Sequence, residues 1–289
     1  MDEMTVNRKI LLPPVLLAVA FVAMYHNVLQ KLVADWANND NYSHGFLIVP
    51  IAAYLAWERR QRFLETVSRP AAAGLLVVVG SICVLLVGIL GSELFLTRIS
   101  IIGTLTGTVL YLFGWQRLRI LAFPLAFLLL MIPIPAIIFN QIAFPLQLLA
   151  SRAGEFTLQS ADIPVLREGN ILILANTKLE VAEACSGIRS LVSLLTLGIV
   201  FGYFTDQRGW VRTLIALSTI PVAIVANGAR VAGTGIAAHS FGAEAARGFF
   251  HEFSGWAVFI VAFLMMMLIQ QALVRLMPPP MSPEPAVAI

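Results

Sequence analysis

Long apolar runs, separated by short polar connections, extend along almost the whole chain. A helix that spans a membrane needs about 20 mostly apolar residues, and about eight runs approach that length. The predicted spans are Ile10–Leu29, Gly45–Trp57, Ala71–Gly91, Leu96–Trp115, Leu118–Phe139, Ile188–Phe204, Thr213–Ala232 and Phe253–Leu276. The pattern therefore predicts an all-α polytopic membrane protein with about eight transmembrane helices.

Basic residues gather in every second connection between these spans. Cytoplasmic connections of membrane proteins carry an excess of Lys and Arg, whereas the opposite connections do not. Both termini are therefore predicted to lie in the cytoplasm. The residues that set this orientation are Arg8, Lys9, Arg59, Arg60, Arg62, Arg117, Arg119, Arg208, Arg212 and Arg275.

The longest connection, Asn140–Ala184, joins the fifth and sixth spans and is predicted to lie outside the cytoplasm. Its first part, Gln141–Gln159, is amphipathic and is expected to form a helix on the membrane surface. Two short β-prone runs within Asn170–Ala182 predict a small β-hairpin. No separate soluble domain is expected, so residues 1–276 form one integral-membrane domain and residues 277–289 a disordered cytoplasmic tail.

The composition agrees with a membrane protein, because 59% of the residues are hydrophobic and only 12% are charged. A soluble domain would carry about 25% charged residues. The net charge of +3 comes from the connection clusters, so nucleic-acid binding is not expected. The two cysteines, Cys83 and Cys185, are interpreted as free thiols. They and the four histidines lack the spacing of a metal site, and no metal or cofactor is predicted.

The predicted topology brings three costly polar residues to the same outer rim. Cys185 precedes the sixth span, Arg230 lies where the seventh span emerges, and His251 lies where the eighth begins. A helix start and a nearby arginine both favour the reactive thiolate form of a cysteine. Arg230 is a candidate to stabilise an oxyanion or the thiolate, and His251 is a candidate acid and base.

Further residues are candidates for support of this site or for substrate binding. Asn227 precedes Arg230 by one helical turn and is placed to orient it or to donate to the oxyanion. Several others flank the cysteine or open the second span, where they either contribute to the site or serve as solvated charges and a helix cap. These residues are Glu183, Ser186, Gly187, Arg189 and His44.

Each residue of the proposed triad also has an ordinary interpretation. Cys185 can be structural, Arg230 can extend to lipid headgroups, and His251 can simply begin a helix. A non-catalytic polysaccharide-export or transport component is another alternative, but it needs polar residues distributed along a pathway through the membrane. Here the ionisable residues gather at one rim, which favours an enzyme. A protease that only hydrolyses its substrate remains a second alternative.

Four short motifs resemble the signature blocks of the exosortases. They occur at Asn41–Gly45 (Asn-Tyr-Ser-His-Gly), Glu183–Leu191 (Glu-Ala-Cys-Ser-Gly-Ile-Arg-Ser-Leu), Asn227–Val231 (Asn-Gly-Ala-Arg-Val) and His251–Trp256 (His-Glu-Phe-Ser-Gly-Trp). The resemblance extends from about Asp35 to Leu276 and is closest to the exosortase A type that accompanies extracellular-polysaccharide loci.

This resemblance implies a cysteine transpeptidase of the bacterial inner membrane with its active site at the periplasmic face. The implied substrates are secreted proteins with a C-terminal PEP-CTERM signal, which comprises a Pro-Glu-Pro motif, a membrane helix and a basic end. Cys185 would be the nucleophile, Arg230 the oxyanion or thiolate partner and His251 the acid and base. The released protein would pass through a thioester to an unidentified cell-envelope acceptor, with membrane lipids as further partners.

Overall fold

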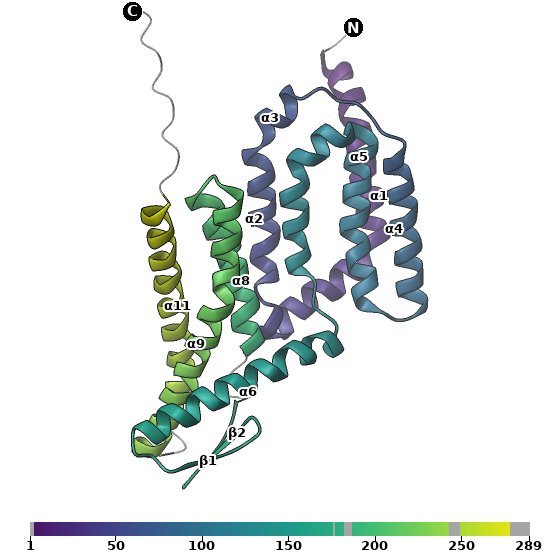
Figure 1. The fold of residues 1–289 in the computed structure, drawn as a ribbon. Coiled ribbons are helices and arrows are strands. Elements are labelled where there is room, and N and C mark those ends of the chain that lie inside the picture. Colours follow the sequence, from purple (N-terminus) through teal and green to yellow (C-terminus); the bar gives the residue numbers. More distant parts are fainter. Residues whose placement is uncertain (1–2, 176, 182–186, 243–248, 278–289) are drawn as a thin grey trace, which may run out of the picture. The chain divides into compact units, whose positions relative to one another are not determined.

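The computed structural model describes residues 3–175, 177–181, 187–242 and 249–277, and it gives only the backbone at 3–12, 40, 187–190 and 249–255. The chain forms two compact units, Met1–Pro135 and Ala136–Ile289. Both consist mainly of helices, and the second also contains a small sheet (Figure 1). The single domain predicted over residues 1–276 stays a prediction. The disordered tail also stays a prediction, because residues 278–289 lie outside the described residues.

The first unit contains five α-helices and two short 3₁₀ helices within the described residues. Gly114, inside the longest helical stretch after the first helix, has φ +80° and interrupts it, so that two arms lie side by side (Figure 1). A side chain at this position would also overlap the carbonyl oxygen of Arg69. The elements are α1 (Glu3–Asn38), η1 (Asp40–Tyr42), α2 (Gly45–Glu58), α3 (Arg60–Glu65), α4 (Ala73–Leu90), α5 (Leu94–Phe127) and η2 (Leu128–Met131).

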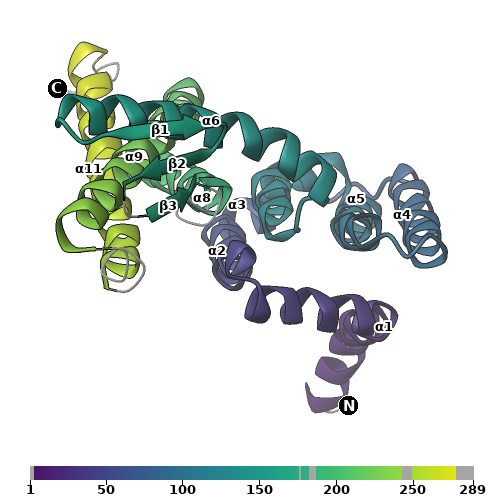
Figure 2. The same cartoon turned by 90° about the horizontal axis from the view of Figure 1, so that it is seen from below.

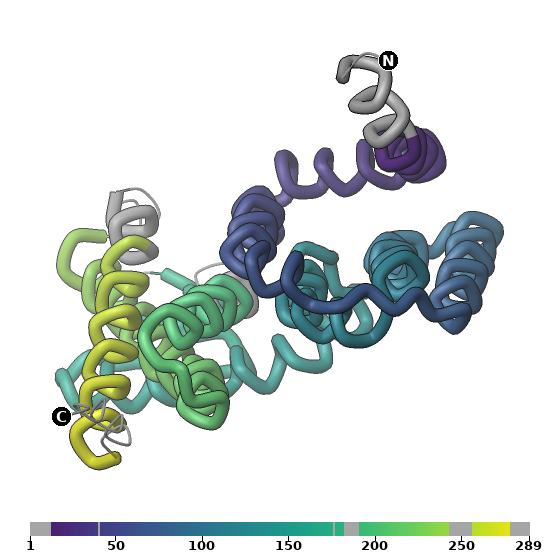
Figure 3. The backbone as a smooth tube through the Cα atoms, turned by 90° about the horizontal axis from the view of Figure 1, so that it is seen from above, coloured from purple at the N-terminus to yellow at the C-terminus, as the bar shows by residue number. Residues whose placement is uncertain are grey.

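The second unit begins with a helix, continues with an antiparallel sheet and ends with three packed helices. These three helices, α8, α9 and α11, lie beside one another (Figures 1 and 3). Leu194 of α8, Ala226 of α9 and Met266 of α11 belong to one buried cluster that holds them together. The elements are α6 (Ala136–Ser160), β1 (Val165–Glu168), β2 (Ile171–Leu174), β3 (Thr177–Glu180), α8 (Gly187–Thr205), α9 (Gly209–Phe241) and α11 (Phe249–Leu276).

Five helical segments of the described chain are long and apolar enough to cross a membrane, which confirms an all-α membrane protein. They are Pro13–Asn38, Ala73–Leu90, Leu94–Met131, Gly209–Phe241 and Trp256–Leu276. Two shorter apolar helices, Gly45–Glu58 and Leu191–Thr205, match the second and sixth predicted spans. The segment Leu94–Met131 contains the fourth predicted span and most of the fifth, and Gly114, one residue before the end of the fourth, interrupts the helix. The count of eight spans and their orientation remain predictions.

The fifth predicted span was placed too far along the chain. It was expected to reach Phe139, but η2 ends at Met131 and a new helix, α6, begins at Ala136. Pro133 and Pro135 cause this break, since proline lacks the N–H that a helix needs and restricts the residue before it.

Three side chains from the N-terminal motif region bind the carbonyl groups that this break leaves without helical partners. Trp36 Nε1 donates to the Met131 oxygen at 3.0 Å, and the Tyr42 hydroxyl donates to the Ile134 oxygen at 3.4 Å. His44 Nε2 lies 3.2 Å from the Leu130 oxygen. Gly45 leaves room for the Trp36 ring, which a side chain there would overlap. Part of this motif therefore has a structural function, because buried carbonyl groups need hydrogen-bond partners.

The sheet has three strands in the order β1-β2-β3, so it is larger than the predicted hairpin (Figure 2). The predicted hairpin corresponds to β2 and β3, in which Leu172 pairs with Leu179. Strand β1, Val165–Glu168, was not predicted from the sequence. Gly169, with φ +63°, provides the turn between β1 and β2.

Candidate functional site

The predicted site residues fall partly outside the described residues. Arg230 and Asn227 lie in α9 with described side chains, and His44 lies in the first unit, directly before α2. Gly187 is the first residue of α8, while Arg189 and His251 occupy the first turns of α8 and α11 with only the backbone described. Glu183, Cys185 and Ser186 lie outside the described residues.

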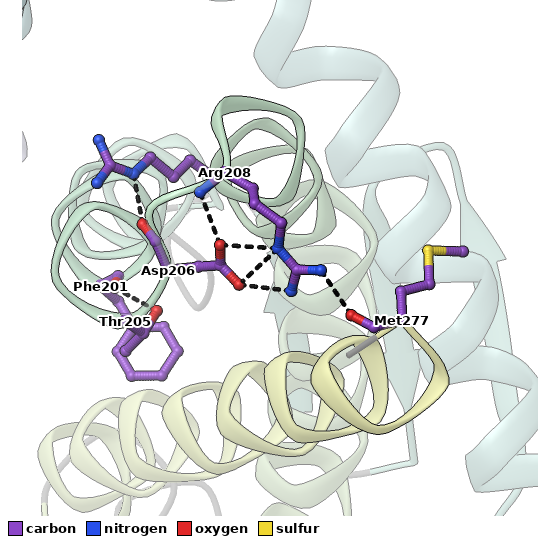
Figure 4. A network of polar contacts seen from close by, with 6 residues as sticks. Phe201, Thr205, Asp206, Arg208 and Met277 are labelled. Atoms are coloured by element: carbon purple, nitrogen blue, oxygen red, sulfur yellow. Dashed lines mark hydrogen bonds and ion pairs between the residues drawn. The ribbon is translucent and has the colours of Figure 1, made fainter. Parts of the chain in front are cut away.

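The connection between α8 and α9 defines one end of the three-helix bundle. The Asp206 carboxylate accepts from Arg208 Nε at 3.0 Å and from Arg208 Nη2 at 2.7 Å. Arg208 Nη1 donates at 2.6 Å to the carbonyl oxygen of Met277, at the end of α11 (Figure 4). Arg212 Nε donates to the backbone oxygen of Asp206 at 2.6 Å. These bonds hold the end of α8, the start of α9 and the end of α11 together.

Gly187, Arg230 and His251 lie toward the opposite end of the same bundle, whereas Cys185 lies outside the described residues. With a rise of about 1.5 Å per residue, Gly187 is about 27 Å from the end of α8, and Arg230 is about 32 Å from the start of α9. His251 is about 38 Å from Leu276, the last residue of α11. The backbone of the three helices therefore brings the start of α8, the Arg230 turn and the start of α11 to one end.

A buried apolar cluster joins the sheet to the turn of α9 that carries Arg230. We call it the sheet cluster. It includes Val231, the residue after Arg230, and Val181, which precedes Cys185 by four residues; both are almost completely buried. The chain just before the predicted nucleophile is thus tied to the Arg230 turn. The members of the sheet cluster are Ala150, Leu158, Ile163, Leu172, Leu174, Leu179, Val181 and Val231.

Helix α6 packs against α9 through a stripe of residues with helical spacing, of which Gly154 allows the closest approach. An added Cβ at Gly154 would stand 2.5 Å from Val231 Cγ1 and 3.2 Å from Leu172 Cδ1. Ala150 and Leu158, one turn before and one turn after, belong to the sheet cluster. The absence of a side chain at Gly154 thus allows α6, α9 and the sheet to meet beside Arg230.

An adjacent stripe of α6 binds the turn between β1 and β2 through polar groups. Arg167 Nε donates to Glu155 Oε2 at 2.7 Å, and Asn170 Nδ2 donates to Gln147 Oε1 at 3.2 Å. The hydroxyl of Ser151, which is fully buried, lies 3.0 Å from the Gly169 oxygen. Helix α6 therefore contacts the sheet through both apolar and polar side chains. Its opposite face carries exposed side chains such as Phe156, which is 73% exposed. The helix itself confirms the prediction for Gln141–Gln159, and its location on a membrane surface stays a prediction.

Asn227 is held in the packed region where α6, α8 and α9 meet. It is 6% exposed and lines a cavity of about 10 Å³ together with Leu146, Leu191, Ala223 and Ile224. Such a volume has room for roughly one water molecule. Arg230 follows one turn later on α9 and is half-buried. The part of Asn227 in orienting Arg230 or donating to the oxyanion stays a prediction.

His44 occupies the N-cap position of α2, as one of its two interpretations expected, but its side chain makes no capping hydrogen bond. It instead contacts the Leu130 carbonyl group, and its Nδ1 atom is buried with no hydrogen-bond partner among the described residues. Its predicted part in substrate binding stays a prediction.

The chain matches the family model described as Transmembrane exosortase over residues 36–268. It belongs to this exosortase family. The matched range includes all four motifs, so the resemblance seen in the sequence is confirmed. No curated protein and no solved structure matches the chain. Exosortases are membrane proteins known for the processing of sorting signals, and membership favours an enzyme of the cysteine-peptidase type.

Sequence reasoning missed the residues that assemble this site. Gly154 looked like an ordinary small residue, and Val231 was noted only as the last residue of a motif, since nothing local shows that the two meet. One ion pair of the first unit could have been expected from the sequence. Arg98 lies inside the fourth predicted span, where a charged side chain needs a partner. The structure pairs Arg98 with Asp35 at 2.5 Å.

Proposed function

We propose that this exosortase is a membrane-embedded cysteine transpeptidase that removes the C-terminal PEP-CTERM signal of secreted proteins. The observation that carries the proposal is the convergence of the start of α8, the Arg230 turn of α9 and the start of α11 at one end of the bundle. Cys185, Arg230 and His251 occupy these three positions in the sequence. Family membership supports the same chemistry.

In the proposed reaction, the Cys185 thiolate attacks the carbonyl carbon of the scissile peptide bond. Arg230, which stays protonated, stabilises the oxyanion that forms. His251, having taken the thiol proton, returns it to the leaving amine, so the C–N bond breaks and a thioester remains. An acceptor nucleophile then attacks the thioester carbonyl carbon and gives its proton to His251, and the C–S bond breaks to release the Cys185 thiolate. The active site is proposed to face the periplasm, on the side where the sheet lies.

The proposal is tested by co-expression with a PEP-CTERM protein from the same organism that carries a cytoplasmic C-terminal tag. The wild-type enzyme should remove the tag, whereas Cys185→Ala should leave it on the full-length protein. Cys83→Ala is the matched control, since Cys83 is an exposed free cysteine in α4, in the other unit, and should not affect cleavage. Cleavage at the wild-type rate by inserted Cys185→Ala enzyme would refute the mechanism.

The mass of the new C-terminus then distinguishes transfer from hydrolysis. An added acceptor mass supports a transpeptidase, whereas a free carboxylate indicates a protease that uses water. Hydroxylamine should divert a thioester to a hydroxamate, and a Cys185-dependent hydroxamate product supports the covalent intermediate. Equal retention of the tag with wild type and with both variants would instead favour a non-catalytic export component.

A further inference from the structure

A cavity of about 260 Å³ lies in the first unit, between α1 and the turn that joins α4 to α5. Two cationic side chains line it: Lys31 of α1, which is exposed, and Arg98 of α5, whose side chain is 2% exposed. Asn27, Ser92 and Thr97 add polar groups. The proposed catalytic residues all belong to the other unit, so this cavity has no part in the mechanism described above.

Arg98 is the most unusual residue of this cavity. Its Nη2 atom donates to Asp35 Oδ2 at 2.5 Å, but its buried Nε atom has no hydrogen-bond partner among the described residues. A guanidinium carries five N–H donors, and a buried donor without an acceptor is costly. Asp35 balances one positive charge, and Lys31 supplies a second. The remaining positive charge and the Nε donor left unpaired within the described chain together favour an anion with several acceptor oxygens.

The remaining lining of the cavity is apolar. Met24 and Val28 of α1, Ile89 of α4 and Leu94 of α5 contribute to it, and all but Val28 are exposed large side chains. The α1 residues recur at the spacing of one helix face, so one side of α1 carries both the apolar side chains and Lys31. A soluble anion gains nothing from contact with apolar side chains, whereas the acyl chain of a lipid packs favourably against them.

The depth of the cavity fits a lipid headgroup. Helix α4 has 18 residues and is therefore about 27 Å long, close to the thickness of the hydrocarbon core. If α4 spans the membrane, its last residue, Leu90, lies at the interface, and the cavity at the following turn lies at the level of the phosphates. Lysine and arginine at this level bind lipid phosphates in membrane proteins.

We infer that this cavity binds the phosphate group of an anionic lipid, with Lys31 and Arg98 as the phosphate contacts and the apolar side chains beside the acyl chain. The shared chemistry of the ligand is a phosphate oxyanion, and inorganic phosphate is the soluble alternative. The inference does not depend on the proposed peptidase activity, because it needs no residue of the second unit.

Native mass spectrometry of the detergent-purified protein tests the inference with two lipids, anionic phosphatidylglycerol and zwitterionic phosphatidylcholine. Wild type should retain one phosphatidylglycerol under collisional activation that removes phosphatidylcholine. Lys31→Ala should weaken the affinity for phosphatidylglycerol about tenfold, since one of two phosphate contacts is lost. Lys178→Ala, which changes an exposed lysine of β3, should bind as wild type does.

A second variant addresses the buried cation while keeping the charge balance. The pair Asp35→Asn with Arg98→Gln removes both members of the ion pair, so no lone charge is left buried. It should also lose phosphatidylglycerol, and a near wild-type melting temperature verifies that it is folded. Equal retention of the two lipids, or equal loss in Lys31→Ala and Lys178→Ala, would overturn the inference. Lys31-dependent calorimetric binding of inorganic phosphate without phosphatidylglycerol retention would also overturn it, in favour of a soluble ligand.

Discussion

Gly154 of α6 faces Val231 of α9 so closely that a Cβ on Gly154 would stand 2.5 Å from the Val231 Cγ1 atom. Val231 follows Arg230 directly and is buried in the sheet cluster. The contact between these two residues therefore fixes the turn of α9 that carries the proposed oxyanion partner. Any change that separates α6 from α9 here should disturb both stability and the position of Arg230.

Replacement of Gly154 by Ala should destabilise the protein by about 1–3 kcal/mol, because overpacking forces the neighbouring side chains or helices to move. Gly233→Ala is the matched control in α9. A Cβ at Gly233 meets nothing within 4 Å, so this change should be neutral or stabilise the helix by up to about 1 kcal/mol. Thermal unfolding in detergent measures both. Equal melting temperatures for the two variants would show that the close contact has no energetic importance.

Replacement of Arg230 by Gln should lower the cleavage rate about 100- to 1000-fold, the usual effect of removing one group that stabilises an oxyanion. Arg230→Lys should recover only part of this rate, since a lysine lacks the planar fork of donors. Arg152→Gln, at an exposed arginine of α6, is the control and should cleave as wild type does. The tag-removal assay gives these rates. An Arg230→Gln enzyme with full activity would assign Arg230 a structural function only.

Replacement of Trp36 by Phe should cost about 1–3 kcal/mol, because the buried Met131 carbonyl group loses its donor. Trp57→Phe provides the control. Trp57 is 64% exposed, and its ring packs under Arg60, which a phenyl ring also allows. Thermal unfolding should therefore separate the two variants. If Trp36→Phe unfolds at the wild-type temperature, the bond to Met131 is not needed to stabilise the break between η2 and α6.

Asp206 gives a pH-dependent prediction. Its hydrogen bonds from Arg208 hold the pKa of the Asp206 carboxyl below its usual range. A carboxyl group with a lowered pKa in the folded state stabilises the protein above the unfolded value of about 3.9, and this contribution is lost as the pH falls through the folded pKa. At pH 7, Asp206→Asn should therefore unfold at a lower temperature than wild type. Its free energy of unfolding should be lower by about 1 kcal/mol.

The difference between wild type and Asp206→Asn should disappear at the acidic end of a series from pH 7 to below the pKa of the carboxyl group. Glu155→Gln is the comparison variant, because it removes a carboxylate from another ion pair, Glu155 with Arg167 at 2.7 Å, which lies outside the α8–α9 connection. A difference for Asp206→Asn that stays constant over the whole series would show that the carboxylate charge does not stabilise the end of the bundle.

The apolar pattern predicted several helices to within one or two residues. The expected span Gly45–Trp57 corresponds to α2 at Gly45–Glu58, and Ile188–Phe204 corresponds to α8 at Gly187–Thr205. Prediction works here because a membrane contains no water to bind backbone groups, so an apolar run of this length must form its hydrogen bonds internally. The pattern was less accurate for the fifth span, because Pro133 and Pro135 end the helix before the apolar run ends.

The apolar pattern and the motifs were therefore enough to predict the membrane class, most of the long helices, the hairpin of β2 and β3, and the exosortase family. The folded chain was needed to show that Gly154 meets Val231, that Arg98 pairs with Asp35, and that β1 adds a third strand held by α6. Apolar periodicity acts between neighbours in the chain, whereas these contacts join residues far apart in sequence. They depend on which side chains fit together after the helices have formed.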